Sequence, residues 1–200
     1  MFFGLFKRKK KSKPPFPTQE YPRKSPLPFD LTVVNFDTAN RNKGSICRIG
    51  LVIVSNQQYY VKTFYVKPKT NTFSMSKKNH ITADTVKDSP SFSQVWPNIL
   101  PYFENQNVVV FYADFHKEAL LSALNKNNLP IPNWKTFTDL YHLAWELAPN
   151  AKHHSLDAVW ERYDLPAHLV TFEGRLLTIY DFFVYLYQEH PRILQVKKYK

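Results

Sequence analysis

Two polar side chains, Asn35 and Asp37, follow an apolar run that begins at Leu31. The β-branched residues at 32–34 predict a buried central strand over 31–38. Residues two apart in a strand point to the same face, so Asn35 and Asp37 stand together where the apolar run ends. A polar pair at the end of a central strand is where α/β sheets often place their chemistry. The alternative is that the two residues only form the turn after the strand.

The elements that must position this pair alternate along the chain. Apolar runs predict strands over 48–54 and 59–66, and the short connections predict an antiparallel meander with 31–38. The remaining expected elements are, in chain order, a helix over 92–103, a strand over 108–111, a helix ending near 124, a strand and helix over 134–147, and a helix over 179–187. The predicted fold class is α/β, with a mixed sheet flanked by helices.

The segment Asn35-Phe-Asp-Thr-Ala-Asn, followed by Ser45-Ile-Cys-Arg-Ile-Gly, resembles the first motif of the DEDDh 3′–5′ exonucleases. These are relatives of the proofreading epsilon subunit of bacterial DNA polymerase III. The family reads Asp-Phe-Glu-Thr, so Asn35 replaces Asp and Asp37 replaces Glu. The segment 78–92 is similar to the family's stretch beside the substrate strand, which makes His80 a candidate nucleic-acid contact or a surface helix cap. The resemblance implies a ribonuclease-H-like fold over 31–187.

The same resemblance places the family's other catalytic positions, and they are altered here. His116 stands where the second motif has a metal-binding Asp. Phe172 replaces the general-base His, and Leu177 replaces the last metal-binding Asp. Ser155 matches the start of a family helix and is expected to cap it. Asp37 is therefore the one catalytic candidate with a carboxylate.

The family's reaction is phosphodiester hydrolysis by two metal ions. Two divalent cations about 4 Å apart repel each other by roughly 17 kcal/mol at an effective dielectric of 20, and clustered carboxylates normally offset this. With only Asp37 kept among the catalytic positions, we expect no metal site and no cofactor. The first hypothesis is a catalytically degenerate exonuclease domain that binds nucleic acid or an unknown protein partner.

The alternative hypothesis is a working exonuclease, dependent on magnesium or manganese, with a rearranged site. It would use Asp37, Asp114, Glu173 and Asp181. It requires at least three of these carboxylates within about 5 Å of one another, so that they can share a metal. A third hypothesis, a structural or interaction protein, predicts no salt-dependent binding of DNA or RNA.

The formal net charge of +11 is concentrated at the two ends of the chain. Residues 1–30 carry a net charge of +6 and residues 188–200 carry +3, which leaves +2 for residues 31–187. We therefore expect an N-terminal arm with a Pro-rich linker over 1–30, one domain over 31–187 and a basic tail over 188–200. The single cysteine, Cys47, excludes an intramolecular disulfide, fits a reducing cytoplasm and is expected in the core.

The N-terminal arm combines apolar and basic residues. The apolar ones suit a membrane surface, the basic ones suit nucleic-acid phosphates, and a solvated arm without a partner is the third interpretation. The apolar residues are Phe2, Phe3, Leu5 and Phe6, and the basic residues are Lys7, Arg8, Lys9, Lys10, Lys11 and Lys13. The apolar part precedes the charges and is too short for a signal peptide. The expected location is cytoplasmic, either free or at the membrane periphery.

Overall fold

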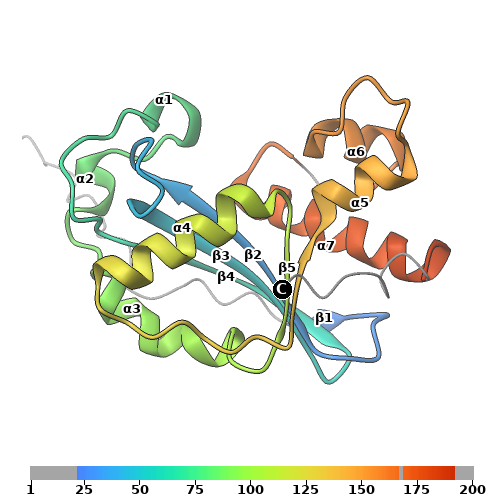
Figure 1. The fold of residues 1–200 in the computed structure, drawn as a ribbon, viewed down its shortest axis with the longest axis horizontal. Helices are drawn as coiled ribbons and strands as arrows, with labels where there is room; N and C mark the ends of the chain where they lie inside the picture. The colour runs from blue at the N-terminus through green and yellow to red at the C-terminus, as the bar shows by residue number, and fades with distance from the viewer. Residues whose placement is uncertain (1–21, 167–168, 192–200) are drawn as a thin grey trace, which may run out of the picture.

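A computed structural model describes residues 22–166 and 169–191, so the apolar and basic arm and the end of the basic tail lie outside the described residues. Six strands form one sheet in the order β1-β4-β3-β2-β5-β6 (Figure 1). The strands are β1 (Arg23–Lys24), β2 (Leu31–Thr38), β3 (Ile46–Ser55), β4 (Gln58–Tyr65), β5 (Asn107–Val110) and β6 (Thr136–Asp139). Strands β1 to β4 pair antiparallel, whereas β5 and β6 are added in parallel to β2. The predicted mixed α/β sheet is confirmed.

Helices cover both faces of the sheet. They are α1 (Ser76–Asn79), α2 (Ala83–Val86), α3 (Phe92–Ile99), the 3-10 helix η1 (Leu100–Tyr102), α4 (Ala113–Lys126), α5 (Leu140–Leu147), α6 (Leu156–Arg162) and α7 (Phe172–Glu189). Helices α5, α6 and α7 share one apolar cluster with the sheet, and α3 and α4 share another cluster with its opposite face. None of the helices in the described ranges is long and apolar enough to cross a membrane.

Strand β2 lies inside the sheet and is buried along most of its length, as its β-branched residues predict. Its alternate side chains point to opposite faces. Val33 packs in the cluster that contains Leu176 of α7, whereas Val34 packs in the cluster that contains Leu120 of α4. Because Asn35 and Asp37 share the alternation of Val33, they lie on the α7 face.

Two helices differ from their predicted extents. The helix expected over 92–103 ends at Ile99, two residues after Pro97, and continues as η1. The last helix begins at Phe172 rather than at residue 179, because Thr171 caps it: the Gly174 N–H donates to the Thr171 hydroxyl at 2.9 Å. Phe172 and Leu177 are therefore both helical.

Residues 22–30, which were expected in the linker, are part of the folded domain. Strand β1 pairs with β4, and Leu27 is fully buried in the cluster under α7. The hydroxyls of Ser25 and Tyr180 are hydrogen-bonded at 2.8 Å. The boundary at residue 31 was wrong for this stretch, because the apolar residues between its prolines pack against α7.

Candidate functional site

The sheet register brings Asn35 and Asp37 together with residues of β3 and β4. Asn35 lies opposite Gly50, and Asp37 lies opposite Arg48. Gly50 in turn lies opposite Thr63 of β4. Paired residues in an antiparallel ladder share a face, so all of these side-chain positions face α7. The site is the place where β2 ends beneath the first turns of this helix.

The Asp37 carboxylate forms an ion pair with the Arg48 guanidinium. The Arg48 Nε donates to Asp37 Oδ2 at 2.7 Å, and the Arg48 Nη2 makes a second, short contact with the same oxygen. On its other side, the guanidinium carbon of Arg48 lies 3.9 Å from the centre of the Phe172 ring. The Arg48 and Asp37 side chains are only 15% and 23% exposed. The guanidinium is thus packed between a carboxylate and an aromatic face.

Burial and the neighbouring charges have opposite effects on Asp37. The net effect raises the pKa of Asp37 above its ordinary value: burial, the larger effect, raises the pKa, and the Arg48 guanidinium, with smaller contributions from Lys78 and Arg175, partly offsets this rise. The groups that act on this carboxylate are therefore all cationic. The three cations were missed from the sequence, although the antiparallel register of β2 and β3 is a signal that could have found Arg48.

Phe172, at the position of the family's general base, fills space above the sheet. A Cβ atom built on Gly50 would lie 2.5 Å from Phe172 Cε1 and 3.1 Å from Leu176 Cδ1. The absence of a side chain at Gly50 lets the aromatic ring lie against strand β3. A phenyl ring has no group that accepts a proton, so Phe172 cannot activate a water molecule.

Leu177 and His116 also have structural surroundings. Leu177 is half-buried and packs against the apolar cluster under α7. His116, in the first turn of α4, is buried, and its Nδ1 accepts the Phe36 N–H at 3.3 Å. Burial lowers the pKa of His116 to about 3, so the ring is neutral at pH 7. His116 therefore satisfies a backbone donor of β2.

The carboxylates of the alternative hypothesis do not assemble. Glu173 accepts the Thr63 hydroxyl at 2.9 Å on strand β4, which is two strands away from Asp37 on β2. Asp114 is exposed, and its carbonyl accepts the Lys43 ammonium group at 3.1 Å. Within residues 22–166 and 169–191, no three or more His, Cys, Asp or Glu side chains are grouped so that they could hold a metal ion. That includes Asp181. The metals implied by the family resemblance do not fit the residues present.

His80 is at the C-terminal end of α1. It is exposed and ends α1 with a left-handed backbone, φ 58°, and its N–H donates to the Ser76 carbonyl. The interpretation as a surface residue at a helix end describes this geometry, and its contact with nucleic acid stays a prediction. Cys47 is buried, and burial raises its pKa to about 12, so it is the expected core residue.

Asp139 organises the turn that leads into α4. Its carboxylate accepts the N–H groups of Tyr112 and Ala113, each at 2.9 Å, and that of Tyr141 at 3.0 Å. Tyr112 has the unusual φ of 79°, which the two neighbouring hydrogen bonds hold in place. The same carboxylate caps α5. Ser155 caps α6, as predicted, by accepting the Ala158 N–H at 3.3 Å.

The sequence comparisons place this domain in a family. The family model described as "Exonuclease" (RNase_T) matches residues 29–168. The chain therefore belongs to the RNase_T exonuclease family. Similar curated proteins are the DNA polymerase III epsilon subunits of Buchnera aphidicola (29% identical over 138 residues) and Pasteurella multocida (26% over 166 residues).

These matches cover 66% and 80% of this chain but only 59% and 65% of the two relatives. The chain thus spans less than two thirds of either epsilon subunit. Among solved structures, the nuclease domain of 3′hExo, a DEDDh family member bound to rAMP, has a TM-score of 0.64 at 14% identity and covers 80% of this chain and 92% of its own. A full-length 3′-exonuclease has a TM-score of 0.66, also at 14% identity, with coverages of 80% and 82%. These structures show the shared fold.

Proposed function

We propose that this chain is a non-catalytic exonuclease-fold domain that binds nucleic acid and does not hydrolyse it. The observation that carries the proposal is the ion pair between Arg48 and Asp37. A divalent cation about 4 Å from the guanidinium would be repelled by roughly 8 kcal/mol at an effective dielectric of 20. A metal at Asp37 would have to displace Arg48, and among the described residues Asp37 belongs to no group of three or more His, Cys, Asp or Glu side chains that could hold the metal.

The remaining positions support the same proposal. The water-activating group of the family's reaction has no equivalent at Phe172, and His116 is neutral and hydrogen-bonded to backbone. A cationic environment at Asp37 replaces the acidic cluster of the family's metal site. Such an environment attracts phosphate groups that the acidic cluster, without its metals, would repel.

Nucleic acid is the proposed ligand because the family consists of exonucleases and a related structure is described as bound to rAMP. A partner-binding scaffold is the second candidate, and it is favoured by the names of the curated relatives, which are polymerase subunits. The two candidates are separable, because only the first requires salt-dependent binding to DNA or RNA.

The test uses the full chain in two parallel measurements. Calorimetric titration with manganese should show no stoichiometric binding, and a labelled single strand incubated with manganese should stay uncut. The same strand should bind in an anisotropy assay and be released by salt. The control variant is Asp37→Asn, which keeps the side-chain shape. Nucleotides released from the 3′ end by the natural chain, and not by Asp37→Asn, would overturn the proposal.

A further inference from the structure

The charges of the folded domain are separated in space. The described residues include 17 Lys and Arg and 15 Asp and Glu side chains. Three segments, 39–45, 66–91 and 118–127, hold eight of these basic residues and three of the acidic ones. The rest of the described chain is therefore net acidic. The nearly neutral total that the sequence gives for residues 31–187 conceals this separation.

The three segments form one surface at the end of the molecule that carries α1, α2 and the end of α4 (Figure 1). The Met75 N–H donates to the Ala39 carbonyl at 3.1 Å, which joins the first two segments. The Lys126 ammonium group donates to Asn42 Oδ1 at 2.6 Å, and that of Lys69 donates to the Lys126 carbonyl at 3.3 Å. We define the lysine surface by four residues on these segments, Lys43, Lys67, Lys69 and Lys126.

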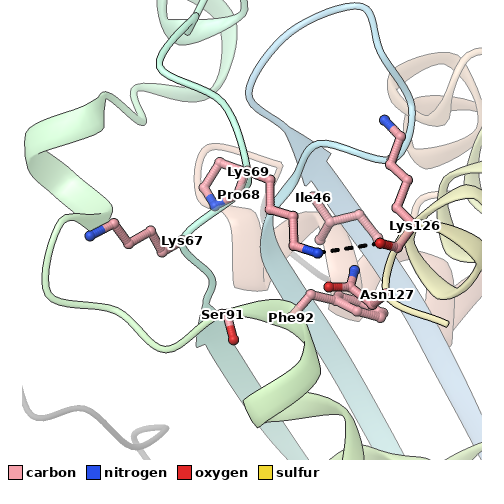
Figure 2. A pocket seen from close by; sticks show the side chains of 9 residues that line it. Ile46, Lys67, Pro68, Lys69, Ser91, Phe92, Lys126 and Asn127 are labelled. Carbon is pink, nitrogen blue, oxygen red and sulfur yellow. Dashed lines mark hydrogen bonds between the residues drawn. The ribbon is translucent and has the colours of Figure 1, made fainter. Parts of the chain in front are cut away.

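Three of these lysines line a small pocket between the start of α3 and the end of α4 (Figure 2). Lys67 donates to the Lys87 carbonyl at 3.0 Å, and the Lys69 and Lys126 ammonium groups also bond to uncharged oxygens. None of the three forms an ion pair within the described residues. Their positive charges are therefore not neutralised by an ion pair with any acidic side chain in the described part of the chain. Lys43, in contrast, is paired with Glu118.

We propose that the lysine surface binds the phosphodiester backbone of a nucleic acid, as a second contact area outside the Asp37 position. Lysine contacts phosphates as a point charge, without reading sequence. The exposed large apolar side chains of the described chain are Tyr112, Ile131, Trp145, Trp160 and Val170, and none lies in the three segments. The three segments therefore have no large exposed apolar side chain that could stack on a base or insert into a membrane surface.

The choice of nucleic acid as the ligand rests on the proposed function. Two variants that each lose three positive charges test the lysine surface itself. Full-length protein is titrated onto a short labelled DNA duplex by fluorescence anisotropy over a series of salt concentrations. The test variant is Lys67→Gln/Lys69→Gln/Lys126→Gln, and the control is Lys24→Gln/Lys135→Gln/Lys152→Gln, three exposed lysines outside the three segments. The test variant should reduce the slope of log K against log salt by about 2.7, since each lost phosphate contact removes about 0.9.

The outcomes are distinguishable. A smaller slope for the test variant, with a nearly unchanged slope for the control, supports the lysine surface. Equal losses in both variants overturn it and leave the proposed function standing. A natural chain that binds no duplex or single strand at any salt concentration overturns both, and binding of anionic lipid vesicles in place of DNA overturns the choice of ligand. Nucleotide release overturns only the absence of catalysis.

Discussion

At the scale of single residues, Arg48 determines the surroundings of the Asp37 carboxylate. Its guanidinium lies between the Asp37 carboxylate and the Phe172 ring, which is the arrangement of a carboxylate with a bound cation. A guanidinium with an aromatic face on one side and a carboxylate on the other gains from both contacts. The positive charge beside Asp37 is therefore supplied by the chain itself.

Replacing Arg48 should destabilise the domain more than replacing both partners. In Arg48→Leu the mostly buried Asp37 loses its counter-charge, and we expect the free energy of unfolding at pH 7 to fall by about 1–3 kcal/mol, the cost of leaving a buried polar group without its partner. The double variant Asp37→Leu/Arg48→Leu leaves no unpaired charge and should regain part of that loss. Urea unfolding of both variants measures the coupling. A double variant that is less stable than Arg48→Leu would contradict this account.

His116 should make the domain sensitive to acid. Its pKa is lowered to about 3 in the folded state, whereas an unfolded chain takes up a proton below about 6.5. The unfolded state thus binds more protons between these values, so stability falls as the pH drops from about 6.5 towards 3. The loss from this group reaches about 2 kcal/mol at about pH 5.

The variant His116→Asn isolates this effect, because the Asn oxygen can still accept the Phe36 N–H and does not titrate. Urea unfolding at neutral pH and near pH 5 gives the comparison. The natural chain should lose more stability between the two conditions than His116→Asn does. Identical pH dependence of the two proteins would show that His116 takes up its proton while folded.

At the scale of elements, the packing of α7 on β3 determines where Phe172 lies. Phe172 is on the first turn of α7. Its ring lies against Gly50, the glycine of β3, which has no side chain to fill that space. This contact depends on the helix beginning at residue 172, which the Thr171 cap ensures. The space next to Gly50 is therefore filled by the Phe172 ring and the Leu176 side chain.

Gly50→Ala should therefore destabilise the domain. The added Cβ would lie 2.5 Å from the Phe172 ring, and overpacking of this kind costs about 1–3 kcal/mol. In a Phe172→Ala background the same change should cost much less, since the ring is gone. The comparison is Gly44→Ala, where the Cβ would lie 2.5 Å from Ser122 Oγ and 2.9 Å from Lys126 Cδ, two side-chain atoms that bond rotation can move, so we expect a smaller cost than at Gly50. Thermal and urea unfolding should give the same order.

The elements were easier to predict from the sequence than the contacts that they make. The strand at 31–38 and the polar pair at its end follow from β-branched residues and alternation. The start of α7 was missed because its signal is a single Thr171 hydroxyl ahead of a mixed segment. The role of Arg48 was missed because it depends on the register between two strands and on a ring 124 positions further along the chain. The family resemblance identified His116 as a candidate position. Its hydrogen bond with the Phe36 N–H joins residues 80 positions apart, so it follows only from the folded structure.

At the scale of the whole molecule, residues 22–30 pack against α7, which lies far along the chain. The segment at 22–30 adds an edge strand to the sheet and inserts Leu27 into the cluster formed with α7, and Ser25 bonds to Tyr180. The surface charge is arranged on the same scale, with the lysine surface at the α1, α2 end of the molecule. Folding thus depends on contacts between segments about 155 positions apart, and so does the position of α7 over Asp37.

Leu27→Ala should accordingly weaken the entire fold and not only its edge. Leu27 is fully buried, and removing its side chain leaves a cavity at a cost of about 2–5 kcal/mol. Because the cavity lies between the first strand and the last helix, tryptophan fluorescence and far-ultraviolet circular dichroism should report one shared, lower unfolding midpoint. Ile131→Ala is the control, since Ile131 is 62% exposed and its loss should change stability by less than about 0.5 kcal/mol. If Leu27→Ala shifts the midpoint no more than Ile131→Ala does, residues 22–30 are an appendage of the domain, and the domain begins at Leu31.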